Sequence, residues 1–117
     1  MLVVDDEAIV RMNAAEHLEL EGYEVLEAEN AAAALAALAV RPDVGVLFTD
    51  VHMPGELDGM ELAREVHARW PDILILVTSG RLRPSNDDIP DDGRFLPKPY
   101  MGEALTRSVA ELIERHA

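Results

Sequence analysis

The sequence predicts an α/β fold, a doubly wound parallel sheet of five strands within a single domain, residues 1–117. Short apolar runs that read as strands alternate with helical patterns, and this alternation builds a parallel sheet covered by helices on both faces. The runs at 46–49 and 73–77 contain only apolar or β-preferring residues, as in strands buried on both sides. With 49% hydrophobic residues, the chain can bury a substantial core.

The first predicted strand is the apolar run at residues 1–4, which ends abruptly in Asp5 and Asp6. The segment after it predicts a helix, because apolar residues recur there at the spacing of one helical face. These residues are Val10, Ala14, Ala15 and Leu18. Gly22 ends this helix. The first strand delivers the two carboxylates of Asp5 and Asp6 to its own carboxyl end.

The second strand and helix follow directly. Residues 24–28 alternate between polar and apolar side chains, which is typical of a strand with one partly wet face and favours an edge position. Asn30 is a suitable cap for an alanine-rich helix over residues 31–39. Pro42 prevents that helix from continuing.

The third and fourth strands are the most apolar. Residues 46–49 lead straight into Asp50, and the turn-forming residues that follow place Asp50 at the tip of the strand. Asp58 is a credible cap for the third helix, and Leu62, Ala63 and Val66 form its inward face. The run at 73–77 predicts a central strand that ends at Thr78.

The remainder of the chain departs from this regular pattern. In the segment 81–93, Pro84 and Pro90 bracket only five residues and no apolar face repeats, so we expect the fourth helix to be short or missing. Residues 95–96 form a minimal last strand that leads to Lys98. The closing helix has an apolar stripe made of Leu105, Val109, Leu112 and Ile113.

Charge and composition exclude several classes of function. The chain has 10 Lys and Arg against 23 Asp and Glu, and a net charge of −13 argues against binding nucleic acid. The absence of cysteine removes disulfides and cysteine metal sites, and it fits a cytoplasmic setting. No apolar run approaches the roughly 20 residues that span a bilayer, so no membrane association is expected. The partners should be proteins or cations.

Polar side chains follow four of the five predicted strands: Asp5 and Asp6, then Asp50, Thr78 and Lys98. Taken singly, each has a plainer role as a helix cap, strand end or surface cation. The carboxyl ends of parallel strands share one rim, however, so we expect these side chains to converge. Carboxylates held together repel, and the usual remedies are protonation or a hard divalent cation with oxygen ligands. Mg²⁺ suits the site because it leaves room for a phosphate oxygen. Asp50 is then the candidate nucleophile, with Lys98 and Thr78 on the phosphoryl oxygens.

At these positions the sequence resembles the receiver domain of bacterial two-component response regulators. The resemblance covers essentially the whole chain and implies a flavodoxin-like sheet in the order 2-1-3-4-5. The matching residues are Val3-Val4-Asp5-Asp6-Glu7, Asp50, Met53-Pro54, Asp58-Gly59, Thr78-Ser79-Gly80 and Phe95-Leu96-Pro97-Lys98-Pro99. The turn after Asp50 is one residue longer than the common spacing in the family.

The resemblance implies that Asp50 accepts a phosphoryl group from a sensor histidine kinase or a histidine phosphotransfer protein. Mg²⁺ would be held by Asp6, Asp50 and the backbone carbonyl of His52, with Asp5 acting largely through water. Such a domain is a phosphoacceptor switch in a phosphorelay. It catalyses its own phosphorylation and dephosphorylation and is not a turnover enzyme.

The same resemblance assigns roles on the other side of the site. Thr78 and Lys98 would bind the phosphoryl oxygens, and Phe95 would be the aromatic residue whose rotamer reports the state. The Lys98-Pro99 peptide bond would be cis. We also expect Phe95 to switch by packing alone, because it has no hydroxyl group.

Several alternatives remain open from the sequence. The chain is either a stand-alone regulator or the receiver domain of a hybrid histidine kinase or a longer regulator, and a homodimer is also open. A phosphatase of the aspartyl-phosphate type is a weaker alternative. Such enzymes have the pattern Asp-x-Asp after the strand. His52 stands where the second Asp would be, so this chain supplies no general acid at that position.

Overall fold

The computed structural model describes residues 1–52, 57–80, 89 and 93–115. Its strands pair in parallel into one five-stranded sheet in the order β2-β1-β3-β4-β5, so the expected fold class and strand order are confirmed. The strands are β1 (Leu2–Val4), β2 (Leu26–Ala28), β3 (Val46–Asp50), β4 (Leu74–Ser79) and β5 (Arg94–Pro97). The order reverses direction after β2, which makes the sheet doubly wound.

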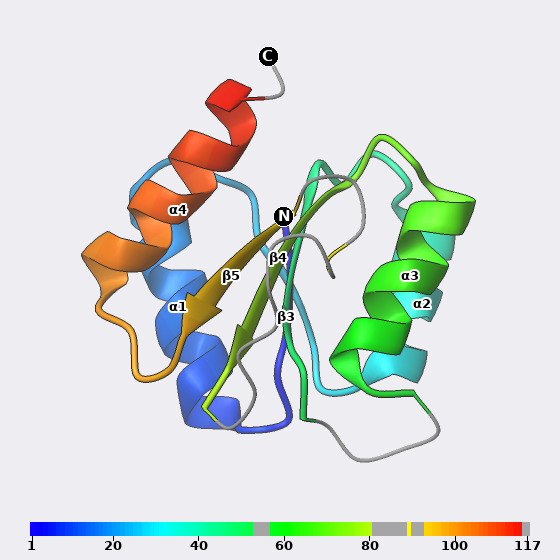
Figure 1. Ribbon diagram of the computed structural model, residues 1–117, viewed down its shortest axis with the longest axis horizontal. Coiled ribbons are helices and arrows are strands. Elements are labelled where there is room, and N and C mark those ends of the chain that lie inside the picture. The colour runs from blue at the N-terminus through cyan, green and yellow to red at the C-terminus, as the bar shows by residue number, and fades with distance from the viewer. Residues whose placement is uncertain (53–56, 81–88, 90–92, 116–117) are drawn as a thin grey trace.

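Helices cover both faces of this sheet (Figure 1). The described helices are α1 (Ala8–Leu20), α2 (Ala31–Val40), α3 (Gly59–Arg69) and α4 (Gly102–Arg115). In Figure 1, α1 and α4 lie together on one side of the sheet, and α2 and α3 lie together on the other. Among the described residues, no helix combines the length and the apolar character that crossing a bilayer requires.

The sheet separates two apolar cores. The core under α2 and α3 includes Leu38, Leu62 and Val66, each with no exposed surface. The core under α1 and α4 includes Leu18 and Phe48, which are 0% and 2% exposed. Burial of large side chains on both faces explains why residues 46–48 of β3 and 74–77 of β4 are apolar, up to the polar residues with which both strands end.

Two helices begin where their sequences predicted a cap. The Asn30 side chain accepts a hydrogen bond of 2.8 Å from the backbone N–H of Ala33 at the start of α2. At the start of α3, Asp58 accepts a bond of 2.9 Å from the N–H of Glu61, and the Glu61 carboxylate accepts one of 3.1 Å from the N–H of Asp58. This reciprocal capping box fixes the first turn of α3, which lies beside the end of β3.

Two boundaries differ from the expectation. The edge strand β2 begins at Leu26 and not at residue 24, because β1 has only three residues and pairs Leu2 with Leu26 through Val4 with Ala28. In α4, Ile113 is 37% exposed, so its assignment to the buried stripe was wrong. Each residue turns the helix by about 100°, which carries Ile113 away from the sheet-facing side.

The expected lack of a full helix in the segment 81–93 concerns residues 81–88 and 90–92, which lie outside the described residues. Of this segment the structure describes Ile89 and Gly93. Ile89 is 3% exposed and belongs to the core under α2 and α3. Gly93 lies so close to Ile89 and to the carbonyl of Ile75 that a Cβ atom would collide with both. The last strand therefore begins from a tightly packed position.

Candidate phosphoacceptor and metal site

The polar rim forms at the carboxyl ends of the strands, as the sequence predicted. Asp50 is the last residue of β3 and pairs in register with Thr78 of β4. Asp5 immediately follows β1, and Lys98 immediately follows β5. The parallel pairing of β1, β3, β4 and β5 thus brings four segments that are distant in sequence to one edge of the sheet.

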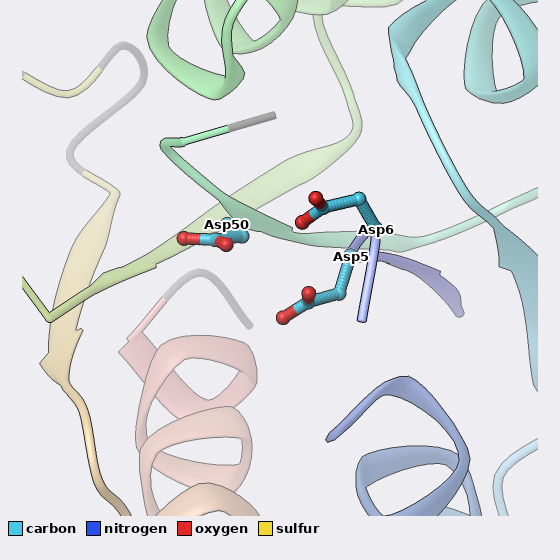
Figure 2. A group of neighbouring side chains, drawn as sticks. All are labelled: Asp5, Asp6 and Asp50. Carbon is cyan, nitrogen blue, oxygen red and sulfur yellow. The ribbon is translucent and has the colours of Figure 1, made fainter. Parts of the chain in front are cut away.

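Three carboxylates form the acidic part of this rim (Figure 2). One oxygen from each of Asp5, Asp6 and Asp50 lies within 4.8 Å of the other two. Asp5 and Asp50 are buried, at 3% and 4% exposure, whereas Asp6 is exposed. Figure 2 shows that two of the carboxylates come from adjacent residues at the end of β1 and the third from the end of β3.

Lys98 provides the opposing charge. Its Nζ lies 3.1 Å from Asp5 Oδ2 and 3.1 Å from Asp50 Oδ2, so one ammonium group joins the ends of β1 and β3. The Lys98 side chain is 17% exposed, which leaves this ion pair screened little by solvent. The Lys98–Pro99 peptide bond is cis.

Hydrogen bonds fix Asp5 at three further points. Its backbone N–H donates to the carbonyl of Ala28 at 3.2 Å, and its Oδ1 accepts from the N–H of Glu7 at 2.9 Å. Its carbonyl accepts from the guanidinium of Arg11 at 2.9 Å. The turn after β1 is therefore tied to β2 and to the first turn of α1.

The environment shifts the ionisation of the central pair. Burial raises the pKa of Asp50 above its ordinary value; Lys98 counteracts this shift and Asp5 adds to it. Burial also tends to lower the pKa of Lys98, but its hydrogen bonds to the two carboxylates outweigh burial and the net pKa is raised. Lys98 is therefore a cation at neutral pH, and burial makes ionisation of Asp50 in the folded protein cost free energy.

Two polar groups beside Asp50 have hydrogen-bonding capacity to spare. Thr78 is 1% exposed, and its hydroxyl has no hydrogen-bond partner among the described residues. The backbone N–H of His52 donates to Asp50 Oδ1 at 3.4 Å, at the long end of the accepted range. A buried hydroxyl without a partner is costly, and Thr78 is adjacent to Asp50 across the β3–β4 pairing. An oxygen-rich group on Asp50 would satisfy it.

The start of α3 closes tightly on the end of β3. The N–H of Gly59 donates to the carbonyl of Val51 at 2.8 Å. A Cβ atom at position 59 would collide with the backbone carbonyl of Asp50, so only glycine allows this approach. The packing of α3 therefore helps to fix the backbone that carries Asp50.

The donor set suits a hard divalent cation. Carboxylate oxygens are the ligands that Mg²⁺ and Ca²⁺ take in proteins, and Asp6 and Asp50 offer such oxygens within 4.8 Å of each other. The exposure of Asp6 leaves that side open to water, which Mg²⁺ retains in its coordination sphere. The backbone carbonyl of His52, the third ligand expected from the sequence, follows two residues after Asp50 in the chain.

Not every predicted residue touches this cluster. Phe95 pairs with Val77 within the sheet and is partly buried against the core under α2 and α3. Sequence reasoning missed two contributors, Arg11 and Gly59. Arg11 acts on a backbone carbonyl, a kind of contact that leaves no signature in residue spacing. Gly59 was quoted only as part of a motif, although its lack of a side chain is what the packing requires.

Tyr100 also borders the site. Its ring packs against Phe48 edge to face, with centroids 5.6 Å apart. Burial raises the pKa of its hydroxyl, and the charges of Asp5 and Asp50 raise it further. Tyr100 and Lys98 line a cavity of about 450 Å³ beside the amino-terminal end of α1.

Comparison with known proteins identifies the family of this chain. The response regulator receiver domain model matches residues 1–110, and the chain belongs to that family. Among solved structures, a receiver domain protein of Clostridium thermocellum superposes with a TM-score of 0.84 at 27% identity, over 98% of this chain and 94% of that one. The receiver domain of the hybrid histidine kinase CckA gives a TM-score of 0.83 at 32% identity, over 96% of each chain.

Curated relatives include two kinds of longer protein. The response regulator MprA of a Mycobacterium species (strain KMS) is 38% identical over 98% of this chain. The sensor kinase CckA of Brucella abortus is 35% identical over 98% of this chain. The chain spans 50% of the length of the former and 12% of the latter. It therefore corresponds to one portion of each relative.

Proposed function

We propose that residues 1–117 form one phosphoacceptor receiver domain, in which Asp50 takes a phosphoryl group in the presence of Mg²⁺. The observation that carries this proposal is the position of Lys98 Nζ, 3.1 Å from both Asp5 and Asp50. A cation placed against a buried carboxylate of raised pKa is a feature of sites that stabilise charge during a reaction.

The proposed transfer takes place between this chain, with Mg²⁺ present, and a phosphodonor. An Asp50 carboxylate oxygen attacks the phosphorus, the bond from phosphorus to the donor breaks, and the electron pair leaves with the donor group. Lys98 and the Thr78 hydroxyl then donate hydrogen bonds to oxygens of the new acyl phosphate. Hydrolysis reverses the attachment when water attacks phosphorus and the carboxylate of Asp50 leaves.

Mg²⁺ is the cofactor of the proposal, bound by Asp6 and Asp50 together with the backbone carbonyl of His52. When bound, it neutralises charge on the carboxylates and on the phosphoryl oxygens. Asp5 contributes through its hydrogen bond to Lys98 and through water. The three oxygens within 4.8 Å support this assignment.

The proposed phosphodonor is a sensor histidine kinase or a histidine phosphotransfer protein, since the relatives include a sensor kinase and response regulators. Phosphorylation would satisfy the Thr78 hydroxyl and repack the partly buried Phe95, so that the switch is a packing event. Changed Phe95 ring resonances on phosphorylation would support this step, and unchanged resonances would contradict it. The cytoplasmic setting stays a prediction.

Intact-mass spectrometry after incubation with acetyl phosphate and Mg²⁺ tests the proposal. We expect a mass gain of one phosphoryl group in the wild type and none in Asp50→Asn. Asp72→Asn is the matched control, because Asp72 is an exposed carboxylate before β4, at the opposite end of that strand from the site. Equal gains in the wild type and in Asp50→Asn would refute Asp50 as the acceptor.

A further inference from the structure

We propose that Arg11 is a positioning residue for the metal site. Its guanidinium holds the Asp5–Asp6 peptide and thereby sets the direction in which Asp6 presents its carboxylate to the cation. This inference rests on the proposed function, because it concerns the same Mg²⁺ site. It adds a residue that makes no contact with the cation or the phosphoryl group.

The first step concerns Asp6. Its carboxylate is exposed, and among the described residues it has no hydrogen bond or ion pair. Asp5 differs, because its carboxylate is held by the N–H of Glu7 at 2.9 Å and by Lys98 at 3.1 Å. Within the described part of the chain, the backbone therefore sets the direction in which the Asp6 side chain leaves the turn.

The second step concerns the peptide plane. The Asp5 carbonyl and the Asp6 N–H belong to one rigid planar group. Arg11 Nη1 donates to that carbonyl at 2.9 Å, and the Asp5 N–H on the preceding peptide donates to Ala28 at 3.2 Å. On the other side of Asp6, the Glu7 N–H of the next peptide is held by Asp5 Oδ1 at 2.9 Å. With the peptides on both sides of the Asp6 Cα held, its side chain leaves the turn in one direction, toward Asp50 (Figure 2).

The third step concerns Arg11 itself. Its Nε donates to Glu27 Oε1 of β2 at 3.1 Å, while Nη1 holds the Asp5 carbonyl. The side chain is 18% exposed. A planar guanidinium anchored at two separate acceptors is held in one orientation, which a lysine ammonium at the same place does not reproduce. The edge strand, the first helix and the acidic turn are thus joined through one side chain.

Charge alone makes the opposite prediction, which sharpens the test. Replacing Arg11 by glutamine makes the protein more negative close to the acidic cluster, and Coulomb attraction would then strengthen cation binding. Weaker binding in Arg11→Gln therefore reports the lost hydrogen bond. Arg41→Gln is the matched control, since Arg41 pairs with Glu24 and Asp43 before β2 and β3, away from the rim.

The experiment measures the Mg²⁺ dissociation constant by isothermal titration calorimetry at fixed ionic strength. We expect Arg11→Gln and Arg11→Lys to bind Mg²⁺ roughly 10-fold more weakly than the wild type, which is the usual scale for losing a group that orients a metal ligand. Arg41→Gln should bind as the wild type does. If Arg11→Gln fails to fold, Arg11→Lys carries the test.

A second readout needs no metal. The Glu7 N–H donates to Asp5 Oδ1 within the same turn, so its amide hydrogen exchange reports the order of that turn. We expect faster exchange at Glu7 in Arg11→Gln and unchanged exchange in β4. Equal protection at Glu7 in the variant and the wild type would overturn the positioning role.

The outcomes separate the two proposals. Mg²⁺ binding by Arg11→Gln that equals or exceeds that of Arg41→Gln would overturn the inference and leave the proposed function intact. A loss of unfolding free energy with an unchanged dissociation constant would also overturn it, because the role would then be merely structural. A wild-type protein that binds no Mg²⁺ would instead refute the metal assignment in the proposed function.

Discussion

Among single residues, the charges of Asp50 and Lys98 have opposite effects on the free energy of unfolding. Burial raises the pKa of Asp50, which means that its charged form is less favourable in the folded protein than in the unfolded chain. Lys98 offsets part of this cost through its 3.1 Å contact. The pKa of Lys98 is raised, so its contribution to stability is present below its ordinary value of 10.5 and is lost as the pH rises through the higher folded value.

Replacing Asp50 by asparagine should therefore stabilise the protein at pH 7, by about 0.5 to 2 kcal/mol, the usual size of a stabilising substitution at a functional site. The contribution of Asp50 to stability falls as the pH rises above 3.8 through the raised folded pKa, and asparagine removes this fall. Urea unfolding of the wild type and of Asp50→Asn at pH 3 and pH 7 measures the difference between their free energies of unfolding. A stability difference that does not grow with pH would contradict the account.

Replacing Lys98 by methionine should destabilise the protein by roughly 1 to 3 kcal/mol, because two buried carboxylates lose a charged hydrogen-bond partner. In the proposed function Mg²⁺ binds the folded state at this cluster and supplies positive charge there, so added Mg²⁺ should stabilise this variant more than the wild type. Thermal unfolding with and without Mg²⁺ measures both effects. Equal stabilisation of the two proteins would count against shared electrostatics at the cluster.

At the scale of elements, the contact between α3 and the end of β3 leaves no space for a side chain at position 59. Gly59→Ala should cost roughly 1 to 3 kcal/mol, as overpacking usually does, and should weaken Mg²⁺ binding by moving the backbone of Asp50. Gly45→Ala is the control, because a Cβ atom there meets nothing within 4 Å. Similar unfolding free energies for the two variants would show that the contact is not tight.

The elements that sequence reasoning located well carry strong local signals. Asn30 and Asp58 cap α2 and α3 as expected, because a capping side chain satisfies N–H groups within its own first turn. The start of β2 was misplaced because pairing with the short β1 decides it, and Ile113 was misassigned because its neighbours already fill the inward face. Interactions between distant elements set these details, and local patterns do not contain them.

For the whole molecule, the topology explains why so much of the site could be predicted. A parallel sheet gathers the ends of its strands, so Asp5, Asp50 and Lys98 were expected together and lie within hydrogen-bond reach. The contact of Arg11 with the Asp5 carbonyl could not be predicted. It depends on the angle at which α1 leaves the turn, and any long polar side chain on α1 is an equal candidate from the sequence.

Mapping the modified residue tests the central claim most directly. After incubation with acetyl phosphate and Mg²⁺, borohydride reduction converts an aspartyl phosphate into homoserine, which peptide sequencing by mass spectrometry locates. The account predicts homoserine at position 50 alone, and none when Mg²⁺ is withheld. Homoserine at Asp5 or Asp6, or equal conversion without Mg²⁺, would contradict it.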